Sequence, residues 1–170
     1  MSDPSSFLGA HAMTTSTRQD QPTMRYFDDF APGDEFDLGT CRITRSDIVA
    51  FARQFDPQPF HVDERAAADS IYGGIIASGW HTISLYMRLF VEGLLHDAAS
   101  LGSPGVDKVR WRHPVRPDDV LTARATVQEV TPSRSRPDRG NVRWAYEMRN
   151  QDGVVVMTME GIGMFQRKRC

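Results

Sequence analysis

A change in hydrophobic period near the middle of the chain constrains the fold more than any other feature. From Gly79 a mostly apolar run extends to about Ala99, with apolar residues on most of the circumference of a helix. A helix of this kind is buried within its domain. The apolar positions at helical spacing are Trp80, Ile83, Met87, Phe90, Val91, Leu94, Leu95 and Ala98.

The second half of the chain alternates between apolar and polar residues. This alternation in 121–128 and 142–149 predicts strands that bury one face. Asp152-Gly153 is typical of a hairpin turn and predicts a further strand over 154–165. One buried helix followed by long antiparallel strands predicts an α+β architecture in which the sheet wraps the central helix, which is a hotdog layout.

The part before residue 79 is predicted to contribute an extension, a strand and two helices. Residues 1–24 are rich in polar side chains and are predicted to be a flexible N-terminal extension, leaving 25–170 as one domain. A strand is expected over 36–43. Ser46 is expected to cap a helix that runs to about Phe55, and a short helix is expected over 63–69.

Composition argues against several classes of partner. The net charge of −2 gives no overall attraction to nucleic acid. Arg88 and Glu92 interrupt the longest apolar run, so no membrane span is expected. Cys41 and Cys170 are isolated, which fits a reducing compartment, and no metal site is expected from their spacing to the histidines. A cytoplasmic protein is therefore expected.

The segment 55–61 carries the strongest chemical signal. Asp56 and His61 are separated by a stretch that contains Pro57 and Pro59, and each proline fixes its own φ and restricts the residue before it. A carboxylate and an imidazole held in one cavity can bind a water and move its protons near neutral pH. The alternative is a proline-rich turn with a solvated Asp and a surface His.

The glycine-rich segment 73–79 suggests a second element of the site. Ser78 is a suitable N-cap for the long helix, and Gly79 leaves space for a ligand to approach the backbone. Free N–H groups at a helix N-terminus can bind a polarised carbonyl oxygen. The alternative is an ordinary glycine turn before a capped helix.

These two segments together resemble the motif of the MaoC-like dehydratases, the (R)-specific enoyl-CoA hydratase group of the hotdog fold. The resemblance lies in Asp56, Pro59 and His61, followed by 74–79 with the sequence Gly-Ile-Ile-Ala-Ser-Gly, and in the stretch 109–119. It covers about 25–167. Two positions depart from the family pattern: Ser78 stands where many members have His, and Met87 stands where some members have a hydroxyl that supports the catalytic Asp.

The resemblance implies reversible hydration of a 2-enoyl thioester, a reaction of fatty acid metabolism, with acyl-CoA as the substrate. It implies catalytic roles for Asp56 and His61 and an oxyanion-binding role for the Gly79 amide. Substrate contacts are expected from Ser78, Trp80, Pro59 and Ile76. No cofactor is implied beyond the coenzyme A of the substrate, and a homodimer or higher homo-oligomer is expected.

Two other functions remain open at the sequence level. A hotdog acyl-CoA thioesterase also needs a carboxylate, a water and an oxyanion donor, and a non-catalytic subunit could bind an acyl thioester without turning it over. The loop that contains Arg134, Arg136 and Arg139 is either a solvated hairpin or a contact for coenzyme A phosphates. His81 and His113 are expected to be structural.

Overall fold

The computed structural model describes residues 24–169, so most of the predicted N-terminal extension and Cys170 lie outside the described residues. Five antiparallel strands form one sheet in the order β1-β3-β4-β5-β2. The strands are β1 (Glu35–Arg42), β2 (Ser100–Trp111), β3 (Val120–Pro132), β4 (Arg139–Arg149) and β5 (Val155–Gln166). The helices are α1 (Arg45–Phe55), α2 (Pro59–Val62), α3 (Glu64–Ala68) and α4 (Gly79–Gly93), with short 3-10 turns at Phe27–Asp29 and Leu95–Asp97.

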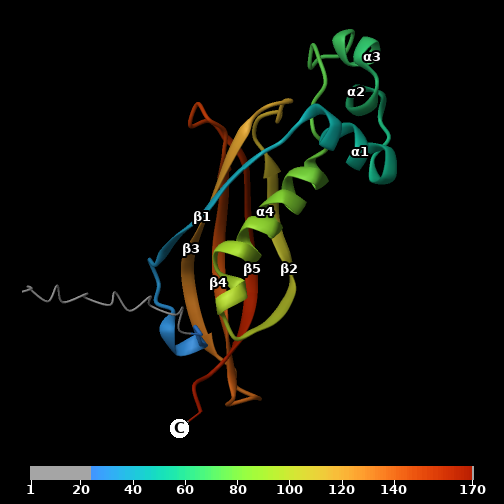
Figure 1. The fold of residues 1–170 in the computed structure, drawn as a ribbon. Coiled ribbons are helices and arrows are strands. Elements are labelled where there is room, and N and C mark those ends of the chain that lie inside the picture. Colours follow the sequence, from blue (N-terminus) through green and yellow to red (C-terminus); the bar gives the residue numbers. More distant parts are fainter. Residues whose placement is uncertain (1–23, 170) are drawn as a thin grey trace, which may run out of the picture.

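The sheet curves around α4, which lies along its concave face (Figure 1). Helix and sheet pack closely at Gly93, where an added Cβ would lie 2.8 Å from the Cα of Leu38 in β1. The helix is shorter than the apolar run predicted. It ends at Gly93 because Leu94 leaves helical geometry with φ −145° and the chain continues as a 3-10 turn.

Helix α4 is buried on one side, whereas the apolar run predicts burial on most of its circumference. The buried residues of α4 are His81, Thr82, Tyr86, Leu89 and Phe90. Trp80, Met87 and Val91 are instead 62%, 47% and 38% exposed. The helix is apolar on two sides and the sheet of one chain covers only one of them, so the hydrophobic pattern alone does not decide which side is inside.

The alternating segments form the core as predicted. Trp144 of β4 is fully buried and packs edge-to-face against Phe30 at 5.4 Å and against Phe90 of α4 at 5.6 Å between ring centroids. The turn predicted at Asp152-Gly153 is present, with Gly153 at φ 74° and its N–H donating to the Asn150 carbonyl at 3.0 Å. Burial of alternate apolar residues on one face thus explains the central strands.

Strands β1 and β2 are the two edges of the sheet. The pairing of β2 with β5 shifts register at three places. A residue with positive φ lies at each shift: Gly102 at 91°, Gly105 at 154° and Lys108 at 50°. Such irregularities are typical of β-bulges at sheet edges.

Helices α1, α2 and α3 form a helical cap that projects beyond one end of the sheet (Figure 1). Thr44, rather than Ser46, is the N-cap of α1. Its side chain accepts from the Asp47 N–H at 3.2 Å, and the Asp47 carboxylate accepts from the Thr44 N–H at 2.9 Å. This reciprocal pair satisfies two N–H groups at the helix start, whereas Ser46 lies inside the first turn.

Residues 24–169 contain neither a membrane-spanning helix nor a cluster of metal ligands. No helix within residues 24–169 is both long enough and apolar enough to cross a membrane. No cluster of three or more His, Cys, Asp or Glu side chains suited to a metal ion is found within the same residues.

Candidate active site

The end of α1 positions Asp56. This residue is the C-cap of the helix, with φ −152° and ψ 68°, and its N–H still donates to the Ala52 carbonyl at 2.8 Å. Pro57 prevents the helix from continuing because a residue before proline is pushed out of the helical region. The Gln58 side-chain amide donates to Asp56 Oδ1 at 2.8 Å. The carboxylate is therefore fixed from both its backbone and its side chain.

His61 lies in α2 and faces the Asp56 carboxylate. Its side chain is buried, and Nδ1 lies 2.7 Å from the Ile76 carbonyl oxygen. A carbonyl only accepts, so Nδ1 carries a hydrogen and donates it. The other nitrogen, Nε2, lies 3.3 Å from Asp56 Oδ2. The two residues singled out in the sequence are thus brought together.

Ser78 lies behind the carboxylate. It is completely buried, and its Oγ donates to Asp56 Oδ2 at 2.7 Å. Ser78 Oγ also accepts a hydrogen bond from the Trp80 N–H at 3.2 Å. Ser78 therefore caps α4, as predicted, and also orients Asp56. Met87 stands where the resemblance expects a supporting hydroxyl in some family members, but its side chain is exposed on α4, and Ser78 supplies the hydroxyl in this chain.

The hydrogen bonds keep Asp56 ionised. Partial burial alone would raise the pKa of this carboxyl group. Hydrogen bonds from Ser78 and Gln58, together with the nearby His61, outweigh that effect and hold the pKa of Asp56 below its usual value. The negative form of Asp56 is therefore the form present at neutral pH.

A cavity of about 540 Å³ opens in front of these residues. Asp56, His61 and Gly79 line it, as do Trp80 and Ile76, two of the residues predicted to contact substrate. Ser78 and Pro59, the other two, do not line this cavity: Ser78 is buried behind Asp56, and Pro59 is exposed at the start of α2. Among residues 24–169, no protein group accepts a hydrogen bond from the Gly79 N–H.

Trp111, at the end of β2, is a site residue that sequence reasoning missed. Its Nε1 donates to the Gly79 carbonyl at 3.0 Å, and a Cβ added at Gly79 would lie 2.2 Å from its ring. Trp111 also packs edge-to-face against Trp80 at 5.9 Å between ring centroids. A residue with any side chain at position 79 would displace the indole, which explains the glycine. No sequence signal links positions 79 and 111, because the contact arises only in the folded chain.

Residues 29–146 match the family model described as MaoC like domain. The chain belongs to this family. It is 42% identical to a solved structure described as a MaoC-like dehydratase from Rhodospirillum rubrum, with a TM-score of 0.79, covering 86% of this chain and 99% of that one. A structure from Mycobacterium tuberculosis described as a double hotdog fold aligns with a TM-score of 0.70 at 15% identity, covering 85% of this chain and 45% of that one. The predicted hotdog fold is confirmed.

Two curated relatives of this MaoC-like chain have names that state an activity. It is 30% identical over 116 residues to a 3-hydroxybutyryl-CoA dehydratase of Methylorubrum extorquens, covering 65% of this chain and 69% of the relative. It is 29% identical over 121 residues to an (R)-specific enoyl-CoA hydratase of Rhodospirillum rubrum, covering 68% of this chain and 78% of the relative. Relatives within the family are thus named as hydratases and dehydratases.

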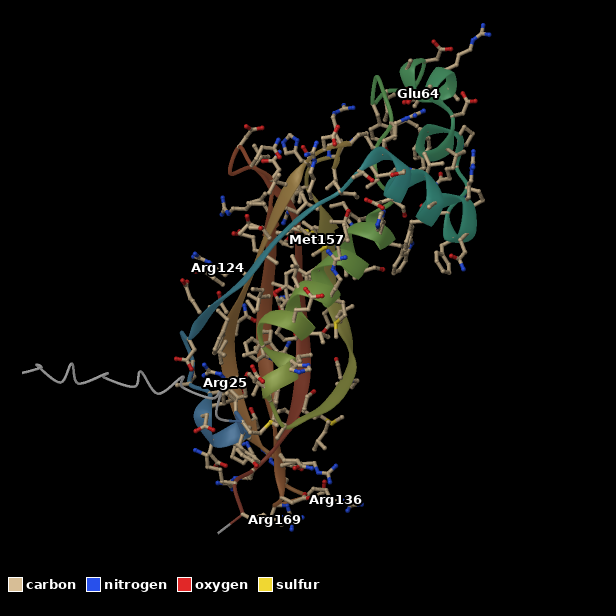
Figure 2. The ribbon with its side chains drawn as sticks, in the orientation of Figure 1. Arg25, Glu64, Arg124, Arg136, Met157 and Arg169 are labelled. Carbon is tan, nitrogen blue, oxygen red and sulfur yellow. The ribbon has the colours of Figure 1, made fainter. Side chains whose placement is uncertain are left out.

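Of the other candidate residues, His113 lines the cavity, whereas His81 and the arginine loop lie outside it. His81 of the MaoC-like domain is stacked on Phe51 with 4.5 Å between ring centroids and does not line the cavity. His113 lines the cavity wall. Arg136 lies at the end of the sheet opposite the helical cap, near Arg169, whereas Glu64 marks the cap end (Figure 2). The arginine loop of one chain is therefore remote from the cavity.

Proposed function

We propose that this MaoC-like protein adds water reversibly across the C2–C3 double bond of a 2-enoyl thioester, giving a (3R)-3-hydroxyacyl thioester. The observation that carries the proposal is the separation of 3.3 Å between Asp56 Oδ2 and His61 Nε2 on the wall of a cavity that also contains Gly79. The names of the hydratase and dehydratase relatives support the same reaction class.

The hydrogen-bond geometry supports a shared water. Because His61 Nδ1 donates to the Ile76 carbonyl, a neutral ring presents an Nε2 lone pair toward the Asp56 carboxylate. Two acceptors in this arrangement are satisfied together by a water that donates one O–H to each. Asp56 and His61 therefore suit the binding of one water molecule in front of them.

In the proposed reaction Asp56 acts as the base. It removes a proton from the water as the water oxygen bonds to C3, and the electron pair of the double bond moves to C2 and the thioester carbonyl. The proton that Asp56 receives passes across their 3.3 Å separation to the lone pair of His61 Nε2, and His61 delivers it to C2, which restores the ionised Asp56 and the neutral His61. Dehydration follows the same steps in reverse.

Gly79 is proposed to stabilise the enolate that forms in between. Its N–H lies at the N-terminus of α4, a helix of 15 residues, so the helix dipole adds positive potential there. A donor that is fixed before the reaction stabilises the developing negative oxygen without reorganisation. The reaction changes no net oxidation state, so the proposal contains no redox cofactor, and coenzyme A enters only as part of the substrate.

The shared water predicts the stereochemistry. Hydroxyl and proton arrive from one face of the planar enoyl group if both residues act on the same side, which is a syn addition. The test is hydration of crotonyl-CoA in deuterated water, followed by chiral chromatography and NMR. An R product with syn deuterium is expected. An S product, or deuterium anti to the hydroxyl, would contradict the arrangement.

The same incubation separates the alternatives. A gain of one water in the mass of crotonyl-CoA is expected. Release of free coenzyme A would instead indicate a thioesterase. An unchanged substrate that still binds would indicate a non-catalytic acyl-thioester subunit. The closely placed Asp56 and His61 favour the hydratase, because binding alone needs no acid and base.

We also propose that the protein forms a homodimer or higher homo-oligomer. Edge strand β2 and the exposed α4 residues Trp80, Met87 and Val91 offer unpaired backbone and apolar surface that a second copy would cover. Light scattering at micromolar concentration is expected to report about twice the chain mass of 19.2 kDa or a higher multiple. A fully active monomer would contradict the proposal.

A further inference from the structure

The positive charges beside the cavity have no part in the proposed reaction. We propose that Arg112, assisted by Arg110, binds a phosphate group of the carrier arm of the substrate. The ligand chemistry is that of a phosphorylated pantetheine thioester, which coenzyme A and a carrier protein share. The inference rests on the proposed function, because a thioester substrate is what brings the phosphate to this site.

A second hollow, of about 660 Å³, lies on the sheet beside the catalytic cavity. Arg124 and Glu147, which line it, alternate along their strands with core residues such as Ala123 and Met148, so it lies on the face of the sheet away from α4. Its charged lining residues are Lys108, Arg110, Arg112, Arg124, Arg149, Glu35, Glu147 and Glu160.

Positive charge exceeds negative charge in this hollow. Three of the cations have a carboxylate partner of their own. These pairs are Lys108–Glu160 at 2.9 Å, Arg149–Glu147 at 2.7 Å and Arg124–Glu35 at 3.2 Å. Within residues 24–169, Arg110 and Arg112 form no ion pair, and the Arg110 guanidinium donates only to the Val109 carbonyl, at 2.7 Å. These two guanidinium groups therefore remain available to an anion.

Arg112 connects this hollow to the catalytic cavity, because it lines both. It directly follows Trp111, whose indole contacts Gly79, and its backbone N–H is anchored to the Val156 carbonyl at 2.8 Å. A substrate with its thioester oxygen at the Gly79 N–H can therefore extend past Trp111 to Arg112. A guanidinium binds phosphate through two parallel hydrogen bonds, which makes arginine well suited to this position.

The test compares three crotonyl thioesters in Arg112→Gln and in the wild type. Crotonyl-CoA and crotonyl-phosphopantetheine carry phosphate, whereas crotonyl-pantetheine carries none. We expect KM to rise about tenfold or more for the phosphorylated substrates and to stay within about twofold for crotonyl-pantetheine, with kcat unchanged. Arg112→Lys keeps the charge and is expected to fall between. Arg136→Gln, at the far end of the sheet, is the distant control and is expected to behave as wild type.

Each outcome decides the proposal. A KM rise for both phosphorylated substrates supports a contact with the pantetheine phosphate, common to coenzyme A and a carrier protein. A rise for crotonyl-CoA alone would indicate a contact with its nucleotide phosphates, which a carrier protein lacks, and would overturn the proposed contact with the pantetheine phosphate. Equal rises for all three substrates, no rise for any, or a phosphate-dependent rise in Arg136→Gln but not in Arg112→Gln would overturn it.

Calorimetric titration with free coenzyme A separates this proposal from the hydratase proposal. If the wild type hydrates no thioester but binds coenzyme A, and Arg112→Gln loses that binding, the phosphate site stands and the hydratase proposal fails. If the wild type hydrates all three substrates and Arg112→Gln leaves every KM and the binding of coenzyme A unchanged, the hydratase stands and the phosphate site fails.

Discussion

The central strands and the helical cap are held in place by different forces. In β3, β4 and β5 the interior is apolar and closed, with Leu121, Trp144 and Val156 fully buried. The cap has a much smaller apolar core, in which Ile48, Ala52 and Ala67 are the buried hydrophobic residues of its three helices. The difference suggests that the sheet supplies most of the stability of the domain.

Hydrogen bonds link the cap to the loop 73–78 that precedes α4. His61 donates to Ile76, Ser78 donates to Asp56, and the Ile76 N–H donates to the Phe60 carbonyl at 3.4 Å. The first two of these bonds are also the ones that set the chemistry of the proposed site. Stability and activity should therefore respond to substitutions in different parts of the molecule.

The largest effect is expected from the two polar residues of the site. Asp56→Asn and His61→Gln should each lower kcat about a hundredfold or more while the protein stays folded, since each removes a positioned acid or base. Because both act on one water, the double variant should lose much less than the sum of the two single losses. Steady-state kinetics with crotonyl-CoA and circular dichroism provide the measurements.

Asp69→Asn serves as the control for these variants, because Asp69 is an exposed carboxylate in the same part of the chain. It is expected to keep wild-type turnover. A folded Asp56→Asn or His61→Gln protein with near wild-type kcat would remove that residue from the mechanism.

In the sheet, substitution of a core residue is expected to lower stability and to leave activity nearly unchanged. Leu121→Ala removes a fully buried side chain of β3 and should cost about 2–5 kcal/mol of unfolding free energy, with little change in kcat per folded molecule. Ile71→Ala is the matched control, because Ile71 is 94% exposed and its loss should cost less than about 0.5 kcal/mol. Urea denaturation of the three proteins measures both values. Equal losses in the two variants would refute the contrast between the regions.

A smaller loss of activity is expected from a substitution at Gly79, at the start of α4. Gly79→Ala should lower kcat/KM roughly tenfold, because the new methyl group would displace the Trp111 indole and shift the proposed oxyanion donor. Trp111→Ala in the same chain removes the clash and should restore part of the activity lost by Gly79→Ala. Steady-state kinetics on the four proteins completes the cycle. If the double variant is no better than additive, the steric explanation is wrong.

The smallest effect is expected from Ser78→Ala, and it appears mainly in the pH profile. Loss of the Ser78 hydrogen bond should raise the pKa of Asp56, so the acid limb of kcat/KM should move to higher pH. Loss of the α4 N-cap should cost about 1 kcal/mol. Ser84→Ala is the control, because the Ser84 hydroxyl donates to the Trp80 carbonyl and not to Asp56. An unshifted acid limb would contradict this role of Ser78.

The lowered pKa of Asp56 also sets the direction in which the stability of the folded protein changes with pH. Ionised Asp56 stabilises the folded state at pH values above the ordinary carboxyl pKa of about 3.9. That contribution is lost as the pH falls from there through the lowered pKa of the folded protein. Ser78→Ala should therefore be less stable relative to wild type above this range than below it, in denaturation measured across acidic pH.

Much of the sheet was predictable because burial on one face leaves an alternating pattern in the sequence. The predicted strands 121–128, 142–149 and 154–165 correspond to β3, β4 and β5, although β3 and β4 are longer. The start of β2 was not predicted, since Gly102, Pro104 and Gly105 interrupt any regular pattern there. The side of α4 that faces the sheet was not predictable, because apolar residues occur on both of its sides.

The proposed site was predictable where it depends on local sequence. Asp56 and His61 stand close together along the chain, and the intervening prolines limit their relative positions. The bond from Ser78 to Asp56 spans 22 positions, and the contact from Trp111 to Gly79 spans 32. Such links depend on how α4 and β2 pack, so neither periodicity nor spacing contains them.

The irregular edge strand β2 affects how readily the protein aggregates at high protein concentration. A straight edge strand can pair with almost any other extended chain, but β2 is bent at Gly102, Gly105 and Lys108. A foreign strand that meets this edge finds only short stretches of evenly spaced donors and acceptors. The bends therefore disfavour edge-to-edge aggregation into fibrils, while a partner surface of matching shape can still bind the edge.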